Sequence, residues 1–361
     1  MRRLVFVIVL VGGTLGLGEL AARIAPPPDP RAGQWTDPAP GLSGEVLLDG
    51  NPWLLWELRP GTHVEKGVQV TVNRLGLRDV ERGPPVRPRA MAVGDSSVYG
   101  FGVETDEVFT ALLEADGRAD FINAAVPGYS TWQSLNLLDT RGLSLEPDLL
   151  LIGNLWSDNN FDSFVDRELL ASYAGWDATW SHRVRAALNA SAGFRWLDWT
   201  LRVAPAAAQA RRVGWQVGDG DPKTGKRRVA INDYAANLDA LAGRMRDRGG
   251  GVVFILLANR EDLRLEAADP AWEPYRQVMR DAATRWGAPL VELAPRYRAS
   301  GASVDSLFLD QMHPTPTGHR ILADAVRDAL GDWPATPLRV RTPSPAPVYH
   351  DRFETTSAPP R

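Results

Sequence analysis

Short apolar segments alternate with amphipathic segments along the central and C-terminal parts of the chain. Continuous apolar runs such as "AMAV" (90–93), "DLLLIGN" (148–154) and "GVVFILLA" (251–258) are typical of strands buried on both faces of a sheet. Segments 131–143 and 231–249 instead repeat apolar residues at helical spacing. This alternation predicts parallel βαβ units, and therefore a three-layer α/β/α sandwich with a central parallel sheet.

The alternation is interrupted over residues 160–228, which we expect to form a mainly helical insertion. This stretch is rich in tryptophan, with Trp176, Trp180, Trp196, Trp199 and Trp215. These side chains could form an apolar lid or a sugar-stacking surface, or they could pack a small helical subdomain. The general burial of tryptophan favours the second interpretation. The basic residues near the end of the insertion are interpreted as a solvated surface, namely Arg211, Arg212, Lys223, Lys226, Arg227 and Arg228.

The N-terminus has the layout of an export signal. Arg2 and Arg3 precede the uncharged apolar run 4–18, and a positive flank ahead of such a run holds the N-terminus in the cytoplasm. Signal peptidase requires small residues at −3 and −1, where Leu20 or Arg23 would fall. We therefore favour an uncleaved membrane anchor, with the remaining chain in the periplasm, over a removed signal peptide and a secreted protein.

These patterns predict an organisation in four parts. They are a signal anchor or signal peptide at 1–25, a linker and N-terminal extension at 26–85, a main domain at 86–332 that contains the insertion, and a proline-rich tail at 333–361.

Composition excludes several classes of function. The 361-residue chain has a net charge of −4, which gives no electrostatic footprint for nucleic acid. It has no cysteine, so disulfides, thiolate metal sites and a cysteine nucleophile are excluded. The sequence also contains no phosphate loop, zinc signature or calcium loop. We therefore expect no metal, no cofactor and no nucleic-acid partner.

Polar clusters follow three of the predicted strands. They are "GDSS" (94–97), "NAAVPGYS" (123–130) and "GNLWSDNN" (153–160), and a fourth, "DQMHPTPTGH" (310–319), precedes the last helix. Ligand sites of open parallel sheets lie beyond the carboxyl ends of the strands. The clusters are therefore expected at one edge of the sheet.

A serine in the first of these clusters could be a nucleophile if the chain supplies a base and an orienting acid. Of the five histidines, His63, His182, His313, His319 and His350, only His313 has an aspartate three residues earlier, Asp310. One compact loop could therefore hold this imidazole and its carboxylate. Ser96 and Ser97 are both candidate nucleophiles by proximity.

Together the clusters resemble the blocks of the SGNH (GDSL) hydrolase superfamily, and "TVNRLGLRD" (71–79) and "ELAAR" (19–23) resemble its bacterial membrane-anchored branch. The resemblance implies the flavodoxin-like SGNH-hydrolase fold. It also implies Ser96 as nucleophile and first oxyanion donor, Gly128 as second donor, His313 as general base and Asp310 as its partner. Where the family has an asparagine as third donor, a gapless alignment places Ser157, with Asn154 or Asn159 as substitutes.

The implied function is that of an exported serine esterase or acylhydrolase. It would cleave O-acyl esters on a cell-envelope glycan or a small ester through an acyl-enzyme, and it would contact the membrane through its N-terminal segment. Two alternatives remain open at this stage. One is O-acyl transfer to an envelope polysaccharide, and the other is a non-catalytic binding or scaffold protein that has kept the fold.

Overall fold

The structure is a computed structural model that describes residues 2–25, 48–51, 53–162, 165–168, 170, 188, 191–203, 226–264 and 272–340. These residues belong to two compact units. The smaller unit contains α1 (Arg2–Ile24), β1 (Leu48–Asn51), most of β2 (Leu55–Leu58), α8 (Ala192–Asp198) and the π-helical turn η4 (Trp199–Val203). All other elements belong to the larger unit.

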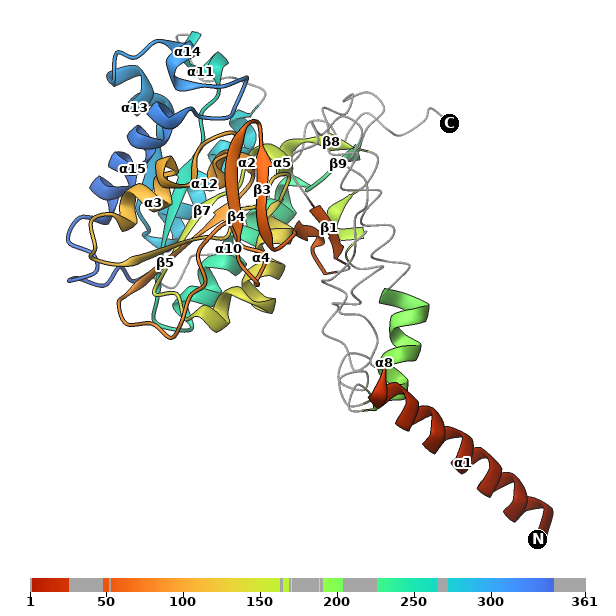
Figure 1. Cartoon of the computed structure of the whole chain (residues 1–361). Helices are drawn as coiled ribbons and strands as arrows, with labels where there is room; N and C mark the ends of the chain where they lie inside the picture. The colour runs from red at the N-terminus through yellow and green to blue at the C-terminus, as the bar shows by residue number, and fades with distance from the viewer. Residues whose placement is uncertain are drawn as a thin grey trace, which may run out of the picture. The chain divides into compact units, whose positions relative to one another are not determined.

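The larger unit is built on a five-stranded parallel sheet (Figure 1). Its strands are β5 (Arg89–Gly94), β6 (Asp120–Asn123), β7 (Leu149–Gly153), β10 (Gly251–Leu256) and β11 (Leu290–Glu292). Every residue of β5, β7 and β10 is buried, as their continuous apolar sequences predict. The strand order is β11-β10-β7-β5-β6, the order of flavodoxin-like folds. The predicted parallel α/β architecture is thus confirmed.

Helices cover both faces of this sheet. The chain moves outward from β5 to β6 and then returns past β5 to β7, so right-handed crossovers place the helix of the first crossover on one face and the helices of the later crossovers on the other. The helices that follow β11 pack on the face of the first. One layer contains α3 (Phe109–Glu114), α13 (Leu293–Ala299) and α15 (Pro316–Leu330), and the other contains α4 (Thr131–Thr140), α10 (Ile231–Arg246) and α12 (Glu273–Trp286) (Figure 1).

Shorter elements complete the larger unit. They are the hairpin β3 (Gly61–Glu65) and β4 (Val68–Val72), the ribbon β8 (Phe161–Asp162) and β9 (Lys226–Arg227), α2 (Ser96–Tyr99), α5 (Trp156–Asn159), α11 (Arg260–Arg264), α14 (Val304–Leu307), and the 3₁₀ turns η2 (Thr105–Glu107) and η3 (Gly142–Leu145).

The insertion differs from its predicted form at its two ends. These ends pair as the antiparallel ribbon β8–β9 instead of continuing as helix, with Phe161 opposite Arg227. The interpretation of Arg228 as a solvated residue is wrong, because its side chain is fully buried against Asp166. Several residues named in the sequence analysis lie outside the described residues. They are Trp176, Trp180, Trp215, Arg211, Arg212, Lys223 and the tail residues 341–361.

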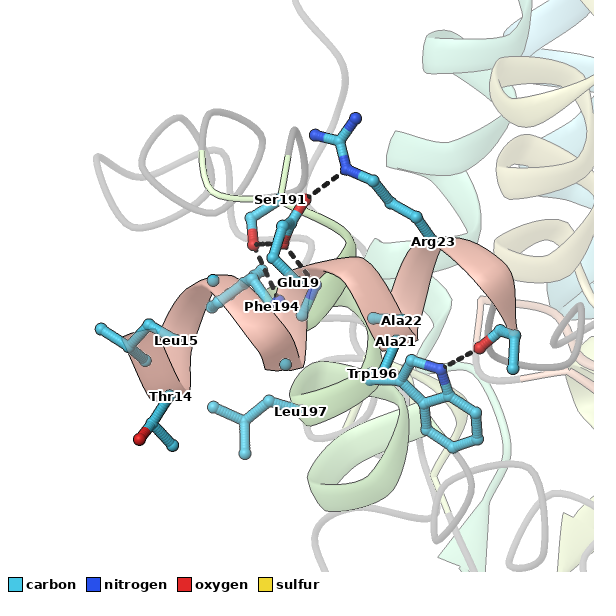
Figure 2. Close-up of a pocket in the computed structure, with 14 residues that line it drawn as sticks. Thr14, Leu15, Glu19, Ala21, Ala22, Arg23, Ser191, Phe194, Trp196 and Leu197 are labelled. Carbon is cyan, nitrogen blue, oxygen red and sulfur yellow. Dashed lines mark hydrogen bonds and ion pairs between the residues drawn. The ribbon is translucent and has the colours of Figure 1, made fainter. Parts of the chain in front are cut away.

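In the smaller unit, Glu19 of α1 binds the start of α8 (Figure 2). Its carboxylate accepts hydrogen bonds from the Ala192 N–H at 3.0 Å and the Gly193 N–H at 2.9 Å. These two amides, assisted by Ser191 and Arg23, lower the pKa of Glu19 to about 2. The two helices line an open pocket of about 1060 Å³. Within the described ranges, no helix is both long and apolar enough to span a membrane.

Replacing Glu19 with alanine removes the acceptor of two amides that have no partner inside α8. We expect hydrogen exchange of the Ala192 and Gly193 amides, followed by mass spectrometry, to become several-fold faster. The control Arg23→Ala removes only an exposed ion pair and should change these rates much less. Equal exchange in Glu19→Ala and wild type would show that Glu19 does not hold the start of α8.

Candidate active site

The structure brings Ser96, His313 and Asp310 together at the carboxyl edge of the sheet. Ser96 begins α2 directly after β5, and His313 lies in the loop between α14 and α15. The Ser96 Oγ and the His313 Nε2 are 2.7 Å apart, and the His313 Nδ1 and the Asp310 Oδ2 are also 2.7 Å apart. A hydroxyl, an imidazole and a carboxylate in this order form the arrangement that can activate a serine nucleophile.

The loop that carries His313 is organised by Asp310 itself. The Asp310 Oδ1 accepts hydrogen bonds from the backbone N–H groups of Met312 and His313, both at 3.0 Å. Partial burial raises the pKa of Asp310, but the hydrogen bond and charge of His313 and these two amides outweigh burial and hold it below its usual range. Asp310 is therefore ionised at neutral pH, and it can orient the imidazole and stabilise its protonated form.

Asp95 holds the turn on which Ser96 sits. Its fully buried carboxylate accepts the Ser97 N–H and the Trp156 N–H, each at 3.0 Å. The first bond caps α2, and the second ties the turn after β5 to the loop after β7. Burial raises the pKa of Asp95 to about 6, although these amides oppose the shift. Asp95 thus braces the turn that carries Ser96.

Ser97 has a different environment from Ser96. Its Oγ donates to the Met312 carbonyl at 3.0 Å and accepts from the Trp156 Nε1 at 3.0 Å, and the residue is 1% exposed. The geometry therefore gives the His313 imidazole to Ser96. Ser97 instead links α2 to the backbone next to His313.

Gly128 sits in a turn that displays its backbone N–H. The Tyr129 N–H donates to the Val126 carbonyl at 3.0 Å, with Pro127 and Gly128 at the two central positions. Gly128 has a φ of 78°, and Pro-Gly with this dihedral defines a type II turn. In the part of the chain that the structure describes, neither this N–H nor that of Ser96 donates a hydrogen bond. Both remain available as oxyanion donors at the ends of β6 and β5.

The three candidates for a third donor differ in their contacts. Asn154 is fully buried, and its side-chain amide donates to the Tyr129 carbonyl at 3.3 Å. It therefore supports the loop that carries Gly128, which we call the glycine loop. Asn159 ends α5 and is 7% exposed. Ser157 lies in the first turn of α5 and is also 7% exposed, and its hydroxyl has no hydrogen-bond partner among the described residues. A free hydroxyl favours Ser157 as the donor.

The remaining described histidines have other surroundings. His63 contacts the Arg59 carbonyl at 2.6 Å. His319 is fully buried in α15, and burial lowers its pKa to about 3. His182 and His350 lie outside the described residues. No cluster of histidine and acidic side chains suited to a metal ion occurs within the described ranges.

Similarity to known proteins is confined to solved structures, because no protein-family model and no curated protein matches the chain. One example is LAE5, an α/β hydrolase from the metagenome of Lake Arreo, with 17% identity and a TM-score of 0.43 over 68% of this chain and 95% of that chain. A second is the acetylxylan esterase Axe2 of Geobacillus stearothermophilus, with 14% identity and a TM-score of 0.43 over 68% of this chain and 94% of that chain. A third is a lipase/acylhydrolase of Enterococcus faecalis, with 14% identity and a TM-score of 0.42 over 67% of this chain and 95% of that chain. At these TM-scores the similarity gives no argument about function. The functional argument rests on the geometry of the site instead.

Arg78 supports the site but shows no catalytic signal in the sequence. Its guanidinium donates to the carbonyls of Tyr99 at 3.1 Å, Gly100 at 2.5 Å and Val103, which follow the turn of Ser96. The buried carboxyl of Glu65, from the tip of β3, lies beside Arg78, and burial raises its pKa to about 7. Arg78 is the second arginine of "RLGLRD" (74–79), and nothing in this stretch indicates the carbonyls that it binds.

Another buried carboxyl, that of Asp158, lies one residue beyond Ser157. It accepts the Thr131 N–H at 2.9 Å and the Thr131 hydroxyl, and thereby joins α5 to the start of α4. Burial raises the pKa of Asp158 to about 8, and nearby Asp166 adds to the shift while Thr131 and Arg228 oppose it. The native state therefore keeps a proton that the unfolded chain releases near pH 4.

This retained proton predicts a specific pH dependence of stability. Between about pH 4 and about pH 8 the native state binds the Asp158 proton and the unfolded state does not, so the free energy of unfolding falls as pH rises. In Asp158→Asn this titration is absent, and the difference in unfolding free energy between pH 5 and pH 9, from urea titrations, should shrink. The exposed residue Asp106 provides the control Asp106→Asn. An undiminished difference in Asp158→Asn would contradict the expected titration.

Proposed function

We propose that the protein is an exported serine esterase that hydrolyses O-acyl esters through a Ser96 acyl-enzyme. The observation that carries this proposal is the hydrogen-bonded series from Ser96 through His313 to Asp310, with both contacts at 2.7 Å. A structural role does not explain why a partly exposed histidine is held between a serine hydroxyl and an ionised carboxylate.

The reaction follows from these positions. The Ser96 Oγ attacks the ester carbonyl while His313 Nε2 takes the hydroxyl proton, and Asp310 stabilises the imidazolium without taking a proton itself. The tetrahedral oxyanion is stabilised by the N–H groups of Ser96 and Gly128 and by the Ser157 hydroxyl. His313 then protonates the leaving alcohol as its C–O bond breaks. Water, deprotonated by His313, releases the acid and restores Ser96.

The natural substrate in this proposal is an acylated glycan of the cell envelope. Two sequence features support it: the N-terminal export pattern, which would place the enzyme outside the cytoplasm, and the resemblance to the membrane-anchored branch. An assay on acylated polysaccharide distinguishes hydrolysis, which releases the free acid, from transfer, which acylates an added polysaccharide acceptor.

The central prediction concerns Ser96. Wild-type protein should hydrolyse p-nitrophenyl acetate and be labelled at Ser96 by a fluorophosphonate. Ser96→Ala should lower kcat by about 10⁴-fold or more and abolish labelling, because the nucleophile is lost. Ser97→Ala should still be labelled at Ser96. Turnover that survives Ser96→Ala would exclude this mechanism, and a wild type without turnover or labelling would favour the binding or scaffold alternative.

A second prediction concerns the third oxyanion donor. Ser157→Ala should lower kcat for p-nitrophenyl acetate by about 10²-fold with little change in KM, because a donor to the oxyanion acts mainly in the transition state. Ser134 on α4 provides a matched control, since its buried hydroxyl also lacks a partner among the described residues. Ser134→Ala should keep kcat within about 2-fold. If Ser157→Ala behaves like this control, Ser157 is not an oxyanion donor.

A further inference from the structure

The two ends of the insertion meet in a buried ion pair next to the glycine loop. Asp166 follows the first strand of the ribbon and Arg228 follows the second, and both side chains are completely buried. The Arg228 Nε lies 2.9 Å from the Asp166 Oδ1, and its Nη2 lies 2.8 Å from the Oδ2. The backbone joins the same ends, because the Asp166 N–H donates to the Arg228 carbonyl at 3.0 Å.

Other donors of Arg228 reach the loop that carries Gly128 and the first turn of α4. Its Nη1 donates to the Gly128 carbonyl at 2.8 Å, and its Nη2 donates to the Gln133 Oε1 at 2.9 Å. The Gln133 Oε1 also accepts the Ser130 N–H at 3.0 Å, and the Ser130 hydroxyl contacts Asp166 at 2.5 Å. The ion pair therefore holds the loop from Gly128 to the start of α4 at three points.

These contacts fix the peptide that follows Gly128. Its carbonyl is bound by Arg228 and its N–H, that of Tyr129, is bound by the Val126 carbonyl. The Gly128 N–H belongs to the peptide between Pro127 and Gly128, which is the central peptide of the turn. This peptide has opposite orientations in type I and type II turns, so the turn type decides where the N–H points. Because the adjoining peptide is anchored, the turn cannot readily change from type II to type I, and the Gly128 N–H keeps its direction as an oxyanion donor.

We propose that Arg228, held by Asp166, is a positioning residue for the Gly128 oxyanion donor, so that the base of the insertion forms part of the catalytic apparatus. The inference rests on the proposed function. Arg228 acts through the loop and does not touch the reacting atoms. Lysine cannot replace it, because a single ammonium lacks the planar fork that binds a carboxylate and a carbonyl together.

The test uses a pair of matched substrates in the full-length protein. An ester and its thionoester analogue differ in the atom that receives negative charge, and sulfur forms weaker hydrogen bonds with oxyanion donors. Arg228→Lys should lower kcat/KM for the ester by about 10²-fold, the size of effect that a 1 Å misplacement produces. The thionoester value should fall by much less. A general loss of folded enzyme would lower both rates equally.

Arg89 supplies the matched control at the opposite end of the sheet. It is also buried, and it binds Asp120 and the carbonyls of Leu145 at 2.9 Å and Gly83 at 2.6 Å. Arg89→Lys should leave the ester-to-thionoester ratio within about 2-fold of wild type. An unchanged ratio in Arg228→Lys would overturn the positioning role while the esterase stands. Absence of Ser96-dependent turnover in wild type would overturn the proposed function and this role together.

Discussion

The candidate site depends on one buried carboxylate, that of Asp95. It accepts one amide from the turn after β5 and another from the loop after β7, so two neighbouring strands are joined at their carboxyl ends. The strand order reverses between β5 and β7, and such a switch point is where open parallel sheets form their crevices. A carboxylate can accept amides from both sides of this crevice, and this gives Ser96 a fixed position relative to Ser157.

Asp95, Asp158 and Asp166 are completely buried at this edge, and each is stabilised in a different way. Asp95 is stabilised by backbone amides, Asp158 by Thr131 and Asp166 by Arg228. A buried carboxyl group without such partners would be unfavourable in either protonation state, because its oxygens lose their hydrogen bonds to water. Each aspartate therefore constrains the backbone that supplies its donors, and those segments carry the nucleophile, the start of α4 and the ends of the insertion.

Local sequence was sufficient for the architecture and for the pairing of His313 with Asp310, whereas the choice of Ser96 over Ser97 came from the family resemblance. The buried strands have continuous apolar runs, and Asp310 lies only three residues before His313, so their contact needs a single loop. The supporting contacts were not predictable in this way. Asp166 and Arg228 are 62 residues apart, and Ser97 reaches a carbonyl 215 residues away. No periodicity links such positions, and the basic neighbours of Arg228 suggested a solvated surface.

The burial of Arg228 changes how the insertion relates to the site. A solvated insertion would be an appendage whose sequence could vary without effect on the glycine loop. With Asp166 and Arg228 joined at its base, the insertion must leave and re-enter the larger unit at fixed points beside Gly128. Removing either charge would leave the other buried and unpaired, which is strongly destabilising. The base of the insertion and the glycine loop are therefore constrained to vary together, whatever surface the remainder of the insertion presents.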